Sequence, residues 1–342
     1  MATTAYTVRS DLVERRERLR AASGSISDDY LNELLAEVDA ALEKVEVGRY
    51  GLCETCNDPI EEDRLELNPL CRFCLDHLNE TERASHQKDL DLATQIQFQL
   101  LPPRSLTLER WETQYRYEPV GAVGGDYCEV TPLGNPSNGM QSLFFAVGDV
   151  AGKGVAASLL MMHLSAIFRS LLSMDLSLAE IVSRANRLFC ESTGPAHYAT
   201  LVCGRTTPNG IEICNAGHCP PILLLHHGTE RAASNGLPLG LFAGAQYTVT
   251  QYAPVDGESL VLYSDGITET ENSSGDDYQE ERLIRSLRDR IEHGAHSMVE
   301  AVLHDLGQFR GAKPASDDVT LLVVRRRGQE ANSPTRQERL NA

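Results

Sequence analysis

Hydrophobic and polar positions divide the chain into two parts with different patterns. Over residues 28–46 apolar residues recur every three or four positions, which predicts an amphipathic helix. The same spacing predicts a short charged helix around residues 8–20 and a long helix over residues 75–101, which ends at "LPP" because proline cannot continue the helical hydrogen bonds. From about residue 113 onward, short alternating or wholly apolar runs separated by turn residues indicate strands.

The second part combines these strands with helical stretches at about 155–173, 177–191 and 279–309. Short turns join most neighbouring strands, which favours antiparallel sheets with helices on their outer faces, an α+β fold. We expect, in chain order, a charged N-terminal segment (1–27), a helix with a small cysteine module (28–79), a linker or regulatory helix (80–112), the sheet-rich domain (113–327) and a disordered polar tail (328–342).

Composition narrows the possible classes of protein. The net charge of −18 disfavours direct nucleic-acid binding, since neutralising phosphates requires Lys and Arg. The longest apolar stretch, "VAASLLMMHLSAIF", is interrupted by His163 and followed by Arg169, so we expect a core helix too short for the roughly 20 residues of a membrane span. No signal segment opens the chain, and nine unevenly spaced cysteines fit reduced thiols, so we expect a cytoplasmic protein without a membrane partner.

The segment "CETCNDPIEEDRLELNPLCRFC" contains two Cys-x-x-Cys pairs with 14 residues between them. Four thiolates in two tight turns complete a closed tetrahedral site, which predicts one structural Zn²⁺ held by Cys53, Cys56, Cys71 and Cys74. Redox-active pairs or unrelated thiols are the alternative. The flanking helices, 28–46 and 75–101, have two interpretations: a stalk that forms a homodimer or transmits a signal, or a helical hairpin packed on its own finger.

Residues 35–78 resemble the zinc finger of the DksA/TraR family. The shared features are the Gly-x-Tyr-Gly-x-Cys-x-x-Cys entry, the Ile and Arg-Leu positions, the Pro and the second cysteine pair. The chain lacks the long N-terminal hairpin with an acidic tip that those proteins insert into RNA polymerase. The resemblance therefore implies a regulatory or structural zinc finger, and binding to RNA polymerase is not expected.

Acidic residues recur in short turns beside the expected strands of the second part. Oxygen ligands suit hard cations such as Mg²⁺ and Mn²⁺, although each of these residues taken singly also fits an ordinary turn. The ordered set favours a metal site. Its members are Asp126 in "VGGDYCEV", Asp149 in "FFAVGDVAGKG", Asp265 in "VLYSDGITET", and Asp317 and Asp318 in "ASDDVTLLVV".

The glycine-rich turn "VGDVAGKG" also raises the alternative of a nucleotide-binding loop. A phosphate loop of the common type requires Gly-x-x-x-x-Gly-Lys-Ser/Thr, in which a glycine stands five places after the first. Here the residue five places after Gly148 is Lys153, and Gly154 follows it. The pattern is not met, so we reject a nucleotide-binding enzyme.

Residues 90–326 resemble the SpoIIE/RsbU branch of the metal-dependent, type 2C-like protein phosphatases. The matching motifs occur in the family's order and include "ATQIQFQLLPP", "VGDVAGKGVAAS", "CNAGHCPP" and "LYSDGITETEN". The resemblance implies an αββα sandwich and hydrolysis of phosphoserine or phosphothreonine in a protein, with a phosphorylated anti-sigma antagonist as the type of substrate. The alternative is a zinc-finger scaffold protein whose phosphatase-like domain is catalytically idle.

The resemblance also implies roles for individual residues. Asp149 bridges two Mn²⁺ or Mg²⁺ ions with help from the Val150 carbonyl, and Asp265 and Asp317 complete the first metal site. Asp126 acts through a metal-bound water or binds a metal directly. Two such ions activate the water that attacks phosphorus. The remaining residues of interest are Asp318, an alternative ligand to its neighbour; His218 and Lys153, without an assigned role; and Cys128, Cys203 and Cys214, expected in the core.

Overall fold

The computed structural model describes residues 2–21, 28–78, 80–134, 141–194, 196–233 and 236–328. The chain forms two compact units, Met1–Ala93 and Thr94–Ala342. The polar tail expected over 328–342 lies, beyond its first residue, outside the described residues.

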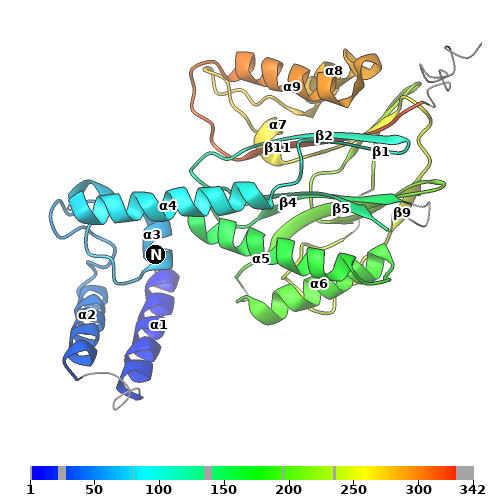
Figure 1. Cartoon of the computed structure of the whole chain (residues 1–342). Helices are drawn as coiled ribbons and strands as arrows, with labels where there is room; N and C mark the ends of the chain where they lie inside the picture. Colours follow the sequence, from blue (N-terminus) through cyan, green and yellow to red (C-terminus); the bar gives the residue numbers. More distant parts are fainter. Residues whose placement is uncertain are drawn as a thin grey trace, which may run out of the picture. The chain divides into compact units, whose positions relative to one another are not determined.

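The first unit consists of helices and a small finger. Its elements are α1 (Ala2–Ala21), α2 (Asp28–Glu46), α3 (Glu62–Leu67), the 3₁₀ helix η1 (Leu75–His77) and the N-terminal part of α4 (Glu80–Leu100) (Figure 1). The helix expected over 75–101 was wrong at its start. Residues 75–77 form a separate turn, in which the backbone N–H of His77 donates to the Cys74 carbonyl, and α4 begins at Glu80.

Helices α1 and α2 pack against each other through the apolar stripe of α2. Val38 of α2 and Leu12 of α1 are both completely buried in this contact. Tyr50 and Leu70, which belong to the finger, pack against the same cluster. The apolar stripe of α2 is therefore covered by α1, and this contact does not decide between the two interpretations of the flanking helices, 28–46 and 75–101.

The second unit contains two antiparallel sheets. The six-stranded sheet has the order β1 (Ser105–Leu108), β2 (Trp111–Glu118), β11 (Val319–Arg326), β10 (Ser259–Tyr263), β7 (Ile222–Leu225) and β8 (Gly228–Arg231). The five-stranded sheet has the order β3 (Asp126–Leu133), β4 (Ser142–Val150), β5 (Ala199–Thr207), β6 (Gly210–Ala216) and β9 (Thr250–Tyr252). The sheet domain thus includes strands that precede residue 113, where the strand pattern becomes visible in the sequence.

Helices cover both outer faces of this pair of sheets, as Figure 1 shows. They are α5 (Gly154–Leu172) and α6 (Leu178–Ser192) on one face, and α7 (Asp265–Thr268), α8 (Glu280–Arg288), η3 (Ile291–His293) and α9 (Gly294–Arg310) on the other. Three separate buried clusters fill the spaces between the layers: one under α5 and α6, one between the sheets and one under α8 and α9. This arrangement confirms the expected αββα sandwich.

Two expectations about helices changed in detail. At 19 residues α5 is long and apolar enough to cross a membrane, so the expectation that it is too short was wrong. However, side chains such as Leu164 and Phe168 are fully buried against the five-stranded sheet, which makes α5 a core helix. The stretch 279–309 is interrupted: α8 ends at Arg288, and α9 begins at Gly294, which adopts a left-handed backbone conformation (φ 87°).

Candidate functional site

Two of the expected metal ligands come from neighbouring strands of the five-stranded sheet. In β4, Phe145 and Val147 face the other sheet, so the alternation of a strand points Asp149 to the same side. In β3, Cys128 faces that side, and so does Asp126 two residues earlier. Asp126 and Asp149 are opposite each other in the register of β3 and β4. Opposite side chains on antiparallel strands are neighbours, so the two carboxylates lie together at the end of the inter-sheet space.

The six-stranded sheet contributes polar groups from the start of β11. The hydroxyl of Thr320 donates to Oδ2 of Asp126 over 2.5 Å, and both side chains are buried. The two carboxylate oxygens of Asp318 accept hydrogen bonds from the backbone N–H of Val120 (2.8 Å) and of Gly125 (2.7 Å). These bonds connect β11 with the loop that leads into Asp126, so both sheets fix the position of the acidic residues.

Glycine is required where this loop and the start of α7 pass close to Asp318. A Cβ added to Gly124 would lie less than 3.0 Å from the Asp318 carboxylate, and one added to Gly266 equally close to the Asp318 carbonyl. Real Cβ atoms do not make such contacts, so a side chain at Gly124 would displace the loop or the Asp318 side chain, and one at Gly266 would displace the backbone. The absence of side chains lets Asp265, the residue before Gly266, approach the start of β11.

The glycine-rich turn after β4 places Lys153 beside another of the acidic residues. Gly152 (φ 114°) and Gly154 (φ 69°) adopt backbone conformations that favour glycine, and α5 begins at Gly154. The Lys153 ammonium donates to Oδ2 of Asp317 and to the Ser316 carbonyl, both over 3.1 Å. The Lys153 side chain is 72% exposed, so this is a surface ion pair at the rim of the site.

Burial and mutual repulsion raise the pKa values of the carboxyl groups. Burial, followed by the charges of Asp265 and Asp317, raises the pKa of Asp149 to about 7. Burial is the main reason that the pKa of Asp265 lies above its usual range, and the charge of Asp317 adds to the effect. Burial also raises the pKa of Asp126, and Asp149 adds to that effect. Residues distant in the sequence therefore share one strongly negative region.

This donor set fits hard divalent cations. All the groups are oxygen donors, and a cation would relieve the repulsion that, after burial, raises the pKa of Asp149. Among the described residues, donor atoms of three or more acidic, His or Cys side chains lie within 4.8 Å of one another only in the finger, so the carboxylates are spaced more widely. Wider spacing suits ions such as Mg²⁺, which retain several water ligands.

His218 stabilises the strand that pairs with the Asp149 end of β4. Its Nδ1 lies 2.8 Å from the Thr200 hydroxyl, and Thr200 is the register partner of Asp149 in β5. The backbone N–H of His218 donates to Oδ1 of Asn215. Burial lowers the pKa of His218 to about 4, so the imidazole is neutral at pH 7 and holds strand β5 in place.

Gln97, near the C-terminal end of α4, is a site-supporting residue that sequence analysis did not identify. Its side chain is fully buried; Nε2 donates to the Gly124 carbonyl over 2.7 Å, and Oε1 accepts from the Gly124 N–H over 3.1 Å. One turn earlier, the Thr94 hydroxyl donates to the Ala122 carbonyl. Both residues thus hold the loop that leads into Asp126.

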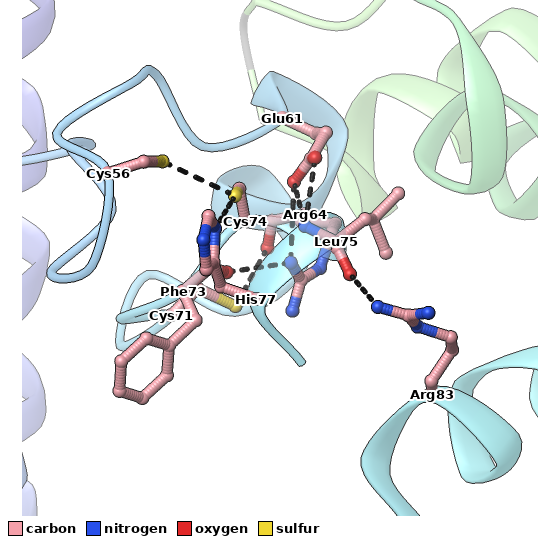
Figure 2. A network of polar contacts seen from close by, with 9 residues as sticks. All are labelled: Cys56, Glu61, Arg64, Cys71, Phe73, Cys74, Leu75, His77 and Arg83. Atoms are coloured by element: carbon pink, nitrogen blue, oxygen red, sulfur yellow. Dashed lines mark hydrogen bonds and ion pairs between the residues drawn. The ribbon is translucent and has the colours of Figure 1, made fainter. Parts of the chain in front are cut away.

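The finger brings together a second set of metal donors (Figure 2). The Sγ atoms of Cys53, Cys56 and Cys74 and a ring nitrogen of His77 all lie within 4.8 Å of one another. Cys56 and Cys74 are 3.8 Å apart at their sulfur atoms, and Nδ1 of His77 lies 3.2 Å from the Cys74 sulfur. Thiolates with imidazole form a typical zinc donor set, so the residues present fit Zn²⁺.

Cys71, one of the four zinc ligands expected from the sequence, lies outside this group. Its Sγ is 3.7 Å from the carbonyl oxygen of Arg64 in α3, in hydrogen-bonding geometry. His77, which was not expected, takes part in its place. The sequence signal for His77 is that two residues separate it from Cys74, which repeats the spacing of the first pair.

Two family descriptions match the sequence. Residues 140–327, more than half of the chain, match "Stage II sporulation protein E (SpoIIE)". Residues 48–76 match "Prokaryotic dksA/traR C4-type zinc finger". Both resemblances noted in the sequence are confirmed.

Two curated relatives are similar over most of this chain, and a third over a short segment. Protein IcfG of Synechocystis sp. is 24% identical over 281 residues, which are 72% of this chain and 43% of that protein. The phosphoserine phosphatase RsbU of Bacillus subtilis is 22% identical over 245 residues, 70% of this chain and 71% of RsbU. An uncharacterized protein of Aquifex aeolicus is 49% identical over 51 residues, 15% of this chain and 35% of that protein. The chain thus spans less than half of IcfG.

Solved structures show the same fold. The SiaA-PP2C domain of Pseudomonas aeruginosa has a TM-score of 0.61 at 21% identity and covers 71% of this chain and 98% of its own. The PP2C phosphatase domain of SpoIIE from Bacillus subtilis, solved with a fragment of its regulatory domain, has a TM-score of 0.54 at 17% identity and covers 64% of this chain and 63% of its own. The sandwich therefore has the fold of PP2C-type domains.

Proposed function

Because the chain belongs to the SpoIIE family, we propose that its PP2C-type domain removes phosphate from phosphoserine or phosphothreonine in a protein substrate. The observation that carries this proposal is the convergence of acidic residues from separate segments of the chain at one end of the inter-sheet space. Burial, together with their shared negative field, raises the pKa of Asp149 to about 7, as expected for a site that receives divalent cations.

We assign the metal ligands as the family resemblance implies. Asp149 and the Val150 carbonyl, together with Asp265 and Asp317, would hold the ions, and Asp126 would contribute directly or through water. We propose Asp317 rather than Asp318 as the ligand. Both oxygens of Asp318 already accept backbone hydrogen bonds, which supports a role in positioning the loop before Asp126.

Two bound Mn²⁺ or Mg²⁺ ions would supply Lewis-acid activation of water and neutralise charge on the phosphoryl oxygens. The protein's own groups orient this centre. Thr320 holds Oδ2 of Asp126 by a buried hydrogen bond, which leaves the other oxygen for the site. Lys153 partly offsets the negative charge of Asp317 at the exposed rim, where a phosphoprotein would approach.

We propose a phosphorylated protein of the anti-sigma antagonist type as the substrate, within a partner-switching pathway. The similarity to RsbU, described as a phosphoserine phosphatase, supports this class of substrate. The net charge of −18 supports a protein substrate over direct contact with nucleic acid, and we assign no binding to RNA polymerase or membranes.

We further propose a cytoplasmic protein that carries one structural Zn²⁺ and forms a homodimer through the helices expected over 28–46 and 75–101, which the structure forms as α2 and α4. Nine free cysteines fit a reducing compartment. The apolar side chains of Leu92 and Ile96 on α4 are 55% and 42% exposed, which supports α4 as part of the dimer contact. Light scattering of the purified chain tests the dimer.

A manganese-dependent assay on a phosphoserine protein tests the catalytic proposal. Asp149→Ala is expected to lower phosphate release at least about 100-fold, whereas Asp175→Ala, on an exposed turn, leaves it unchanged. Equal activity of the Asp149→Ala variant and the wild type would refute the proposed site. Absence of saturable Mn²⁺ binding in isothermal titration would instead support a catalytically idle scaffold protein.

A further inference from the structure

We propose that the zinc ligands of the finger are Cys53, Cys56, Cys74 and His77, and that Cys71 is a free thiol beside the metal. The tetrahedral edge between two sulfur atoms bound to zinc is about 3.8 Å, given Zn–S bonds of about 2.3 Å. The Cys56 and Cys74 sulfur atoms are 3.8 Å apart, and the Cys74–His77 distance of 3.2 Å is close to the slightly shorter sulfur–nitrogen edge. These four donors therefore already lie near the geometry that zinc requires.

The position of Cys71 argues against coordination. Its sulfur lies against the Arg64 carbonyl at 3.7 Å, where only a protonated thiol donates a hydrogen bond. A zinc-bound cysteine is a thiolate and has no proton to donate. The same carbonyl accepts the Asn68 N–H over 2.8 Å as α3 ends, so the Cys71 thiol adds a second donor to a helix end.

The spacing along the chain supports the same assignment. Residues 57–70 separate Cys56 from Cys71, and these 14 positions fall short of the roughly 15–20 usual between two zinc-binding pairs. Residues 57–73 separate Cys56 from Cys74, and these 17 positions lie within that range. The second pair is then Cys74-x-x-His77, with the same two-residue spacing as the first.

Hydrogen bonds fix the backbone around Cys74 and His77 in a conformation that holds this pair together. The His77 N–H donates to the Cys74 carbonyl over 3.0 Å, which forms the tight turn that directs both side chains to one point. The Glu61 carboxylate accepts the Leu75 N–H, and the Arg64 guanidinium donates to the Phe73 carbonyl over 2.8 Å (Figure 2). Two side chains from the start of α3 thus fix the residues on both sides of Cys74.

The assignment changes the charge and accessibility of the centre. Three thiolates and a neutral imidazole give a zinc site with a net charge of −1, whereas four thiolates give −2. His77 is exposed while Cys53 and Cys74 are buried, so the imidazole is the solvent-facing ligand. Reagents in solution therefore contact His77 before they reach the metal-bound thiolates. The half-buried Cys71 is a thiol that metal binding does not protect.

X-ray absorption of the zinc-loaded full-length chain tests the proposal directly. Three sulfur and one nitrogen ligands are expected; four sulfur ligands would overturn it. Substitution with Co²⁺ provides a second readout, because the intensity of the sulfur-to-cobalt charge-transfer band reports the number of Co–S bonds.

Matched variants separate the two candidate ligands. Cys71→Ser is expected to retain wild-type zinc content and the wild-type cobalt spectrum. His77→Ala should weaken zinc binding by more than about tenfold, and His77→Cys should restore it with a charge-transfer band about one third more intense, because four Co–S bonds replace three. Loss of a sulfur ligand in Cys71→Ser, or an unchanged spectrum in His77→Cys, would show that Cys71 coordinates the metal.

Discussion

Gln97 and Gly124 form a reciprocal pair of hydrogen bonds, in which the side-chain amide of one residue pairs with the backbone of the other at 2.7 and 3.1 Å. Gln97 is completely buried, and Gly124 lies against the Asp318 carboxylate. The last turns of α4 are therefore tied to the loop that leads into Asp126. Movement of this helix end and movement of the site loop are coupled through these bonds.

Replacing Gln97 by alanine leaves both backbone groups of Gly124 without their partner. A buried unpaired polar group costs about 1–3 kcal/mol, so the free energy of unfolding should fall by that order. Amide hydrogen exchange over residues 120–126 should become faster. Gln87→Ala is the matched control, since Gln87 lies on the same helix and its side chain donates to Asp91 at the surface. Unchanged exchange in Gln97→Ala would show that other contacts hold the loop.

Gly124→Ala should disturb the site without changing any acidic residue. The new Cβ would lie less than 3.0 Å from the Asp318 carboxylate and must displace the loop or the side chain. We expect Mn²⁺ affinity, measured by isothermal titration, to fall at least about tenfold. Gly244→Ala is the control, because its Cβ would meet nothing within 4 Å. Equal affinities of the two variants would mean that the loop yields without cost to the site.

Asp149→Asn is expected to stabilise the protein at pH 8 when Mn²⁺ and Mg²⁺ are absent. Burial and Asp265 raise the pKa of Asp149 from 3.8 to about 7, so the folded protein holds this proton more tightly than the unfolded chain. The stability that this group contributes therefore falls as pH rises from 3.8 to 7, by up to about 1.4 kcal/mol per pH unit. Asparagine does not ionise, so the Asp149→Asn variant does not lose this stability as pH rises.

Urea unfolding of Asp149→Asn and wild type at pH 5.5 and pH 8, in zinc-saturated protein, measures the effect. The advantage of the variant should be larger at pH 8. Asp175→Asn, at an exposed position, should show no such difference. The same difference between Asp149→Asn and wild type at both pH values would contradict the raised pKa.

His218 should make the protein less stable in mild acid. Burial lowers its pKa from 6.5 to about 4, so between these values the unfolded chain binds a proton that the folded protein does not. Stability is then lost as pH falls below 6.5, by up to about 1.4 kcal/mol at pH 5.5. In His218→Asn the loss of unfolding free energy between pH 7 and pH 5.5 should be smaller by about this amount, measured by urea titration. An equal loss in both proteins would indicate a charged or exposed imidazole.

The sandwich was predictable from the sequence only as a class of fold. Short turns between apolar runs indicate antiparallel strands, and this expectation is correct for every pairing between named strands in the described residues. The position of β11 between β2 and β10 was not predictable, because it pairs residues some 200 positions apart. Such pairings depend on packing of the whole domain, which local periodicity does not contain.

The acidic site and the finger were also predictable from the sequence only in part. Alternation along β3 and β4 indicates which face each aspartate occupies, but the register that sets Asp126 opposite Asp149 is a property of the folded pair. Gln97 carries no local signal, since its partner is the backbone of a distant loop. His77 did carry one: its position after Cys74 matches the two-residue spacing of a zinc-binding pair. The more familiar repeat of Cys-x-x-Cys obscured it.

Strands β3 and β4 form a hairpin. The two opposed aspartates lie at one end of it, and the segment that connects the strands lies at the other. Asp126 pairs with Asp149 at one end, whereas Leu133 pairs with Ser142 beside the connecting segment at the other. The ladder between them fixes the distance between the two carboxylates independently of how long that connection is. The chain can therefore accept an inserted tag or reporter between Leu133 and Ser142, and new recognition surfaces can arise there, while the spacing of the acidic pair stays constant.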